Sequence, residues 1–345
     1  MATRRSELDI CKGIAIICVV LGHVVTSYRN SGLLTEATLF NFACTFVYSF
    51  HMPLFFLISG SLSTMSRSGG FKEDIGKKVI SYGIPYLIFS IVDFAMKFLL
   101  AGVVNNKVSW VELLGVPLYP IGALWFIYAL LFVSLLHICM NAWVVDARRR
   151  CVIECSLAAA LKLVSCFTLP TWLRNSVFVD MAGYYIWFCI GVYLAPMLIE
   201  MADSIRLKPI HKGVVLPSCA VVFGVALFFC DTYNTVLPEA LMVLPFNVVG
   251  VVLLFLIAKG IGRSKWLEAL GKNSFPIYLL HGYVISAGRV VFSKFRVPLL
   301  QGILPLIVFT ILGVLLPYIA YVVASKVKYL DFCFYPAKYM AKAKK

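Results

Sequence analysis

Apolar residues in this chain form long runs that alternate with short polar clusters. Each run is about 20 residues long, which is the length that a helix needs to cross a hydrocarbon core about 30 Å thick. The pattern repeats from end to end and predicts an all-α polytopic membrane protein with about ten transmembrane helices. The predicted spans are residues 10–28, 41–63, 79–101, 123–143, 151–168, 178–199, 214–230, 238–258, 274–293 and 299–323.

Composition supports the membrane assignment. Of the 345 residues, 61% are hydrophobic and 14% are charged, whereas a soluble domain is about half apolar and about a quarter charged. No predicted loop is long enough to hold a second folded domain, and the sequence has no internal repeat of the kind found in many transporters. We therefore expect one membrane domain over residues 1–325, followed by a basic cytoplasmic tail over residues 326–345.

The charge distribution predicts which side of the membrane each loop occupies. The formal net charge is +15, and most of the 31 Lys and Arg residues lie in alternate loops beside the spans. Cytoplasmic loops are enriched in these residues, so both termini are predicted in the cytoplasm, and the basic character needs no nucleic acid to explain it. The first run follows Arg4 and Arg5, as a signal peptide would. It contains Asp9 and Lys12, however, so we expect a retained helix.

The eleven cysteines do not indicate a disulfide framework or a metal site. Most of them lie within apolar runs, where a thiol behaves as a small hydrophobic group. No CxxC pair or zinc-type spacing occurs in the sequence. We therefore expect no metal.

Ionisable residues inside the first two spans are the strongest functional signal, because such residues are costly in a membrane. Lys12 and His23 are eleven residues apart, which places them about 20° from the same helix face and about 16 Å apart along the axis. This face resembles a track for an anionic ligand. His51 in the second span lies about 18 Å from the cytoplasmic boundary and His23 about 21 Å, so the two histidines are predicted to meet.

A pair of imidazoles in a dry interior suits general acid–base chemistry, and His23 is our candidate base. The alternative is that each histidine makes a polar contact between packed helices. His281 and His137 are predicted nearer the cytoplasmic side, and for His137 we favour a packing role. Trp125 belongs to a group of aromatic residues that suits either an interfacial belt or a sugar-stacking platform.

Several blocks of sequence resemble one enzyme family. Residues 8–23 contain a lysine, ten further residues and a histidine, and similar blocks follow in the same order. These blocks resemble the membrane-bound acyltransferase family 3, and in particular its fucose 4-O-acetylase-like branch. The later blocks are residues 50–60, 84–89, 124–126, 270–274 and 277–281, and the resemblance covers residues 5 to 325.

This resemblance implies a multi-pass enzyme of the bacterial cytoplasmic (inner) membrane. Its expected activity is O-acetylation: transfer of an acyl group, usually acetyl, from cytoplasmic acyl-CoA to a hydroxyl of a lipid-linked or exported carbohydrate. The expected partners are acetyl-CoA as co-substrate, the carbohydrate acceptor and the lipid bilayer. Some relatives carry an additional soluble, hydrolase-like domain that passes the acyl group onward, and here we expect the transfer to finish in this chain or on a separate protein.

The resemblance also assigns roles by position. His23 would be the catalytic histidine, Lys12 its basic partner, and His51 the second-span histidine of the fucose 4-O-acetylase-like branch. His281 matches a recurrent position, and we assign it and Trp125 to substrate binding.

The block around residues 77–86 departs from the family pattern. Ser81 stands where relatives frequently carry arginine. The CoA phosphates are therefore expected to bind Arg67, Lys77 and Lys78, together with Lys12, at a basic cytoplasmic mouth.

Two mechanisms are open to His23. It can deprotonate the acceptor hydroxyl for direct attack, or it can accept the acyl group itself and pass it on. A proton-coupled glycan transporter or flippase is the alternative function, since buried ionisable residues also suit transport. A structural scaffold is a third reading, but it leaves the matched histidines unexplained. An enzyme of this kind needs a CoA site and a transporter does not.

Overall fold

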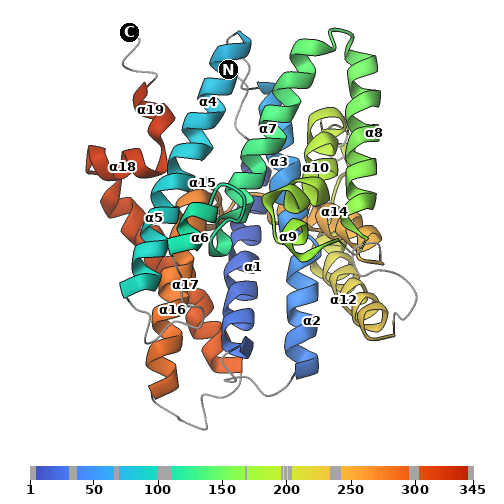
Figure 1. Cartoon of the computed structure of the whole chain (residues 1–345). Coiled ribbons are helices and arrows are strands. Elements are labelled where there is room, and N and C mark those ends of the chain that lie inside the picture. Colours follow the sequence, from blue (N-terminus) through green and yellow to red (C-terminus); the bar gives the residue numbers. More distant parts are fainter. Residues whose placement is uncertain are drawn as a thin grey trace. The chain divides into compact units, whose positions relative to one another are not determined.

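The computed structural model describes residues 5–30, 37–65, 70–99, 110–167, 169–195, 197, 200, 204–233, 242–294 and 303–340. Over these ranges the chain is helical and contains no strand (Figure 1). Arg67, one of the predicted CoA ligands, lies outside the described residues. The expected basic tail includes two short helices, α18 (Lys328–Phe334) and α19 (Pro336–Met340).

Within these described ranges, seven helical segments are long and apolar enough to cross a membrane, as expected of an all-helical multi-pass membrane protein. These segments are Ser6–Asn30, Phe42–Ser63, Phe71–Leu99, Gly122–Trp143, His211–Cys230, Leu244–Ile261 and Leu304–Ala324. Three further predicted spans are also helical: α8 (Ala147–Ser165), the shorter α10 (Val177–Tyr193) and α16 (Ser274–Lys294). The count of ten spans and the cytoplasmic placement of both termini stay predictions.

The chain divides into two compact units. The first unit contains Met1–Phe55 and Met197–Tyr321, and the second contains Phe56–Pro196 and Val322–Lys345. The single membrane domain expected over residues 1–325 stays a prediction.

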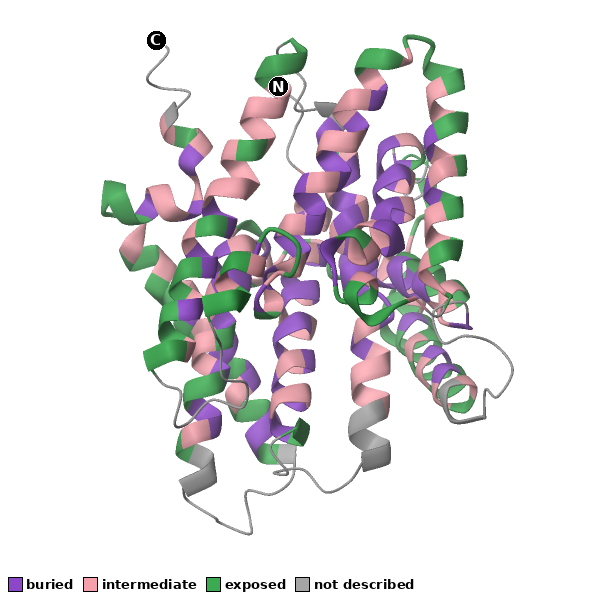
Figure 2. Cartoon of the chain, viewed as in Figure 1, coloured by how far each residue is buried: buried purple, intermediate pink, exposed green. Residues whose placement is uncertain are grey.

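The first unit is built around α1 (Ser6–Asn30), which packs against four other helices. Apolar side chains on several sides of α1 are buried, among them Ile10, Ile16 and Val20, and Figure 2 shows buried and intermediate residues along most of its length. A helix that is apolar all round is stable only inside a bundle or in lipid. The other helices of this unit are α2 (Ala37–Tyr48), α12 (Leu216–Tyr233), α14 (Leu244–Ile261), α15 (Lys265–Lys272), α16 and α17 (Ile303–Ala324, to Tyr321).

The contact between α1 and α15 is made by backbone against backbone. A Cβ atom added to Gly271 would lie 1.8 Å from the carbonyl oxygen of Asp9, and one added to Gly13 would lie 2.3 Å from that of Leu267. Small residues are the usual means by which membrane helices approach this closely. Ser264 caps α15 by accepting the amide hydrogen of Leu267.

The second predicted span is interrupted in its middle. A turn at Ser49 and Phe50 separates α2 from α3 (His51–Met65). A break in a membrane helix frees backbone groups that need new partners. The Asn247 side-chain amide donates to the carbonyl oxygen of Ser49, which satisfies one of these groups just before His51.

The second unit contains the remaining helices. In it α10 packs against α7 and α8, and α4 packs against α7. Figure 2 shows many exposed residues along α8, as expected where a helix faces lipid or solvent. Besides α8, α10, α18 and α19, its helical elements are α4 (Phe71–Lys78), η1 (Val79–Gly83), α5 (Ile84–Leu99), α6 (Trp110–Gly115), η2 (Gly122–Leu124), α7 (Trp125–Trp143) and α9 (Thr171–Arg174).

The π-helical segment η1 joins α4 to α5 and has a sequence cause. Pro85 has no amide hydrogen, so the carbonyl group of Ser81 has no ordinary α-helical donor four residues later. Bonds that reach five residues ahead restore pairing in such a place, and π-bulges are frequent at functional sites. The wider turn sets the rotation of Lys77 and Lys78 relative to α5.

Candidate active site

Three predicted site residues of the first unit lie together. The ring of His23, on α1, has its centroid 4.9 Å from that of His281, on α16. The ring of Tyr48, at the end of α2, lies 6.3 Å from His23 and 4.8 Å from His51. We call His23, His281, Tyr48 and His51 the histidine cluster. His23 and His51 thus approach each other around a shared tyrosine neighbour.

His281 has a defined hydrogen-bonding state. Its Nδ1 donates to the carbonyl oxygen of Tyr278 at 2.5 Å, which leaves Nε2 as the nitrogen that carries a lone pair. The Nε2 atom is buried and has no hydrogen-bond partner among the described residues. His281 was predicted nearer the cytoplasmic side than His23. Because the two ring centroids are 4.9 Å apart, their depths in the membrane can differ by no more than that distance.

The three imidazoles differ in accessibility. His51 and His281 are each 1% exposed, whereas His23 is only partly buried. Nδ1 of His51 donates to the carbonyl oxygen of Val47 in the preceding helix, so this ring is held by its own chain. His23 is therefore the least buried histidine of this cluster.

Lys12 lies on the same helix as His23 but is not part of the histidine cluster. Its ammonium group pairs with the Asp9 carboxylate at 2.8 Å. Because α1 is continuous, the eleven residues between Lys12 and His23 correspond to about 16 Å along its axis. The continuous helix is compatible with the predicted cation-to-imidazole face, which stays a prediction, and Asp9 neutralises the cation in part.

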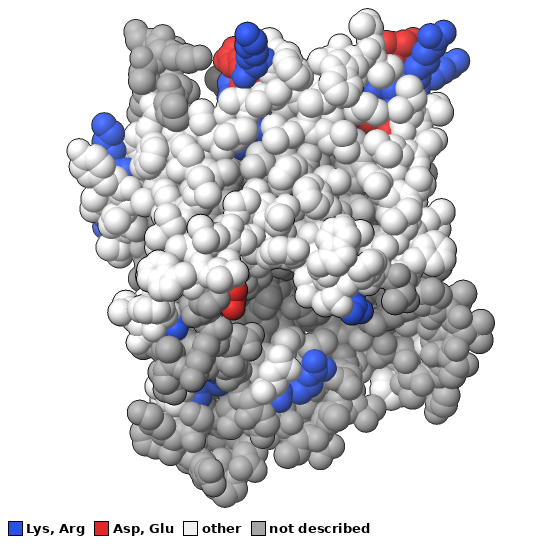
Figure 3. All heavy atoms as spheres, viewed as in Figure 1, with Lys and Arg blue, Asp and Glu red and all other residues white. Residues whose placement is uncertain are grey.

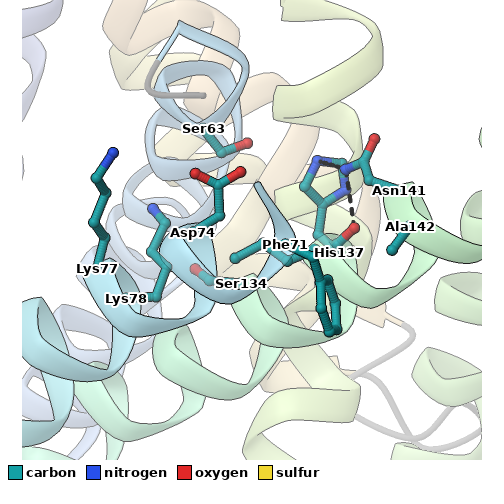
Figure 4. A pocket seen from close by; sticks show the side chains of 10 residues that line it. Ser63, Phe71, Asp74, Lys77, Lys78, Ser134, His137, Asn141 and Ala142 are labelled. Atoms are coloured by element: carbon teal, nitrogen blue, oxygen red, sulfur yellow. Dashed lines mark hydrogen bonds between the residues drawn. The ribbon is translucent and has the colours of Figure 1, made fainter. Parts of the chain in front are cut away.

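Lys77 and Lys78, in the second unit, line a pocket of about 130 Å³ (Figure 4). Lys77 pairs with Glu73 at 3.2 Å, and Lys78 lies over the ring of Tyr82, 5.4 Å from its centroid. The other residues lining this pocket are Ser63, Phe71, Asp74, Ser134, His137, Ile138, Asn141 and Ala142.

His137 forms a buried polar network with three partners. Its Nδ1 lies 3.0 and 3.1 Å from the two carboxylate oxygens of Glu154, which is 0% exposed. The Tyr193 hydroxyl donates to Glu154 at 2.5 Å, and Asn141 Nδ2 lies 2.8 Å from His137 Nε2. A buried carboxylate is tolerated only when it is paired and hydrogen-bonded in this way.

Trp125 begins α7 in the second unit and stacks on aromatic neighbours. Its ring centroid lies 5.5 Å from that of Tyr184, and Tyr184 in turn stacks on Phe56 at 5.0 Å. The side chain of Trp125 is partly exposed. This arrangement is compatible with both the packing and the sugar-stacking roles expected for it.

Sequence reasoning missed Tyr48 and Glu154. Tyr48 gave no signal, because one tyrosine at the end of an apolar run is common at membrane interfaces. Glu154 did give one: it is an acidic residue inside an apolar stretch, where ionisable groups are costly. Had it been weighed with His137, the polar network would have been a reasonable expectation.

Charged side chains are confined to a few places on the face drawn in Figure 3. They gather at one end of α4 and at the turn between α7 and α8, while most of the described surface between them is uncharged. Among the described residues, no group of three His, Cys, Asp or Glu side chains is arranged to hold a metal ion.

Comparison with known proteins identifies the family. Nodulation protein NolL of Sinorhizobium fredii is 30% identical over 224 residues, which are 64% of this chain and 56% of that protein. NolL of Mesorhizobium japonicum is 26% identical over 189 residues, 52% of this chain and 49% of that protein. The chain thus spans about half the length of these relatives, and no solved structure matches it. Residues 5–322 match the acyltransferase domain of the acyltransferase 3 family, and the chain therefore belongs to that family of membrane acyltransferases.

Proposed function

We propose that this protein transfers an acyl group, acetyl in the first instance, from cytoplasmic acyl-CoA to a hydroxyl of a lipid-linked or exported carbohydrate. His23 is the catalytic residue. The observation that carries this proposal is the contrast within the histidine cluster: His23 is its least buried histidine and lies against His281, whose Nε2 is buried without a partner among the described residues.

His281 is suited to position His23. Its Nε2 lone pair can accept a hydrogen bond from one ring nitrogen of His23, which leaves the other His23 nitrogen as a base. Catalytic bases are commonly oriented by a third group in this manner, and their hydrogen bonds often tighten only when substrate is bound. The low-dielectric surroundings strengthen such an interaction once it forms.

The reaction is balanced without any further reagent. In the direct route, His23 takes the proton of the acceptor hydroxyl, and the oxygen attacks the thioester carbonyl carbon. The carbon–sulfur bond breaks and the thiolate takes the proton back from His23, giving an ester and free CoA. In the alternative route the neutral His23 nitrogen attacks the thioester carbonyl carbon, the carbon–sulfur bond breaks, and CoA leaves as the thiol with the proton of the imidazole ring. The acceptor hydroxyl then attacks the acyl-imidazole, the carbon–nitrogen bond breaks, and the imidazole takes the hydroxyl proton, giving the ester and free His23.

The topology that we propose has ten spans, both termini in the cytoplasm, and the bacterial inner membrane as its location. The strongest support is the concentration of Lys and Arg in alternate loops. This topology puts α4, with Lys77 and Lys78, on the side where acyl-CoA is made.

A transfer assay tests the function. Full-length protein in lipid nanodiscs is given acetyl-CoA labelled in the acetyl group and a panel of lipid-linked glycans. The wild type is expected to move label to glycan, and His23→Ala is expected to lower kcat by about 10²–10⁴-fold, the usual contribution of a general base. His211→Ala is a matched control, because it removes an imidazole of the same unit outside the cluster.

Two results would contradict the proposal. Unchanged turnover in His23→Ala would remove His23 from the mechanism. Failure of acetyl-CoA to protect the wild type from thermal unfolding, although ligands that bind the native state do so, would point to another donor or to the transport alternative.

A further inference from the structure

The part of α1 that follows His23 carries a polar side chain beside the imidazole. Thr26 is three residues further along the helix, so it is a surface neighbour of His23 and lies about 4.5 Å closer to the end of α1. Lys12 lies about 16 Å from His23 in the opposite direction. Because Lys12 is expected to bind the CoA phosphates, Thr26 lies on the side of His23 that is left for the acceptor.

Two residues of α2 extend this polar surface. Cys44 and Tyr48 are one turn apart, and Sγ of Cys44 lies 3.5 Å from the hydroxyl oxygen of Thr26. The Tyr48 hydroxyl faces the Thr26 side chain, and the Tyr48 ring centroid lies 6.3 Å from that of His23. These four residues of α1 and α2 therefore form one set of neighbours, and we call His23, Thr26, Cys44 and Tyr48 the acceptor-side group.

The backbone of α1 leaves room for the Tyr48 ring directly beside His23. A Cβ atom at Gly22 would lie 3.0 Å from Cε2 and 3.4 Å from Cζ of Tyr48, and 3.1 Å from Cγ2 of Val47. Cζ carries the phenol oxygen, so the hydroxyl end of the ring is the part that rests on α1. Added volume at a well-packed contact displaces the neighbouring side chain. The glycine thus allows the Tyr48 hydroxyl to lie against α1 one position from His23.

The side chains of the acceptor-side group are all partly exposed. On α1 they are surrounded by buried positions: Gly22 is buried, Val24 is 0% exposed and Val25 is 1% exposed. The group therefore retains accessible polar surface in a part of α1 that is otherwise packed. Because His23 is the proposed base, the acceptor hydroxyl has to approach it at this surface.

The chemistry of this surface fits a neutral ligand that carries hydroxyl groups. The hydroxyls of Tyr48 and Thr26 can each donate and accept a hydrogen bond, as the hydroxyls of a sugar do. Neither carries a charge that would pair with a phosphate or carboxylate. A thioester carbonyl only accepts, so a surface with both functions matches the acceptor better than the acyl group. Sites that hydrogen-bond a substrate hydroxyl discriminate strongly against ligands that lack it.

We propose that Tyr48 and Thr26 are specificity-determining residues for the acceptor, and that their hydroxyls hold a sugar hydroxyl adjacent to the one that His23 deprotonates. This inference rests on the proposed function. A vicinal diol presents one oxygen to His23 and the other to the pair of protein hydroxyls, which fixes the attacking oxygen in place. The acceptor class is therefore a neutral sugar with a vicinal diol, bound on the opposite side of His23 from Lys12.

The Michaelis constants of the two substrates test this role in full-length protein in nanodiscs. Tyr48→Phe keeps the ring against Gly22 and removes only the hydroxyl. Both it and Thr26→Val are expected to raise KM for the glycan about three- to tenfold, the usual effect of losing one neutral hydrogen bond, and to change KM for acetyl-CoA less than about twofold. Thr26→Ser retains the hydroxyl and should restore the glycan KM. Tyr318→Phe, the same change on α17 outside the group, is the matched control.

A binding measurement tests the same residues without turnover. Saturation-transfer NMR with methyl glycosides of neutral hexoses reports direct contact between glycoside and protein. The wild type and Tyr318→Phe are expected to transfer saturation, and Tyr48→Phe and Thr26→Val to lose most of it. Methyl glucuronide, which carries a carboxylate, is expected to bind no better than the neutral glycosides.

The outcomes are read for variants that thermal unfolding shows to be folded. Equal increases in both KM values, an equal effect of Tyr318→Phe, or no glycoside binding by the wild type would overturn the role of Tyr48 and Thr26. Tighter binding of the glucuronide would overturn the neutral acceptor class. If the wild type acetylates glycan and the variants keep its KM, the proposed function stands and this inference fails. If glycosides bind with the expected variant pattern but no acetyl group moves, the acceptor residues stand and the proposed transfer fails.

Discussion

The buried histidines of the two units differ in how their ring nitrogens are hydrogen-bonded. In the first unit, Nε2 of His281 lies beside the ring of His23 and has no hydrogen-bond partner in the described part of the chain. In the second unit, His137 is bonded at Nδ1 by Glu154 and at Nε2 by Asn141. An imidazole that is satisfied on both nitrogens is fixed and has no basic nitrogen to give. The hydrogen bonds that a histidine makes, more than its depth in the membrane, therefore distinguish a candidate base from a structural residue.

Removing the buried partner of His137 should have the largest effect on stability. Glu154→Leu leaves His137 without its buried partner and strands the Tyr193 hydroxyl, and we expect a loss of about 3–5 kcal/mol in the free energy of unfolding. The double variant His137→Leu/Glu154→Leu should recover most of this loss, because apolar replacement of a whole buried pair is close to neutral. Thermal unfolding in detergent measures both. A double variant no more stable than the single one would show that the pair is not the source of the effect.

Loss of the His281 side chain should lower the catalytic rate more than it lowers stability. His281→Phe keeps a ring against His23 but removes the Nε2 lone pair, so we expect kcat to fall about 10–100-fold, equivalent to about 1.4–2.8 kcal/mol. The melting temperature should fall modestly, because the variant also loses the buried hydrogen bond from Nδ1 to the carbonyl oxygen of Tyr278. His281→Gln, which retains a side-chain acceptor, should recover part of the rate. Equal rates for the Phe variant and the wild type would reduce His281 to a packing residue.

For the first unit, the sequence predicted the helices and the helix that carries His23. The apolar runs located the helices, and the spacing of Lys12 and His23 placed both on one helix whose geometry is regular over its whole length. The neighbour of His23 could not be predicted in the same way. His281 is 258 positions away, and only the packing of α16 against α1 brings it to the ring.

The second unit was less predictable for a physical reason. In a hydropathy pattern His137 and Glu154 each lower the predicted stability of a membrane helix. In the folded protein the two side chains form one hydrogen-bonded pair, which reduces the free-energy cost of burying them. The short α4 was hidden as well. Its charges suggested only a loop, yet it continues through η1 into α5 and presents Lys77 and Lys78 to a pocket.

The hydrogen bond from Asn247 to the carbonyl oxygen of Ser49, just before His51, gives a test with a smaller expected effect in the first unit. Asn247→Leu leaves the buried carbonyl of Ser49 without its donor, and we expect a loss of about 1–3 kcal/mol in stability. The rate should follow stability only, because His23 and His281 keep their positions. Asn247→Asp is not an equivalent control, since a carboxylate cannot donate, whereas Asn247→Gln retains the donor. A Gln variant as unstable as the Leu variant would mean that shape, and not the hydrogen bond, matters here.

The smallest expected effect concerns the ion pair at the pocket of the second unit. The side chains of Lys77 and Glu73 are 40% and 46% exposed, so Glu73→Gln should cost no more than about 0.5 kcal/mol of stability. The same change removes a carboxylate that competes for Lys77, one of the residues expected to bind the CoA phosphates. Binding of acetyl-CoA should therefore become about twofold tighter at low salt and stay unchanged at high salt, where exposed charges are screened. Calorimetry at two ionic strengths measures this, with Glu268→Gln as the control because it breaks the comparable pair with Lys272 in the first unit. Lower stability together with tighter binding in Glu73→Gln, but not in Glu268→Gln, would show that Lys77 binds the ligand. Tighter binding in both variants would show that only the net charge of the protein matters.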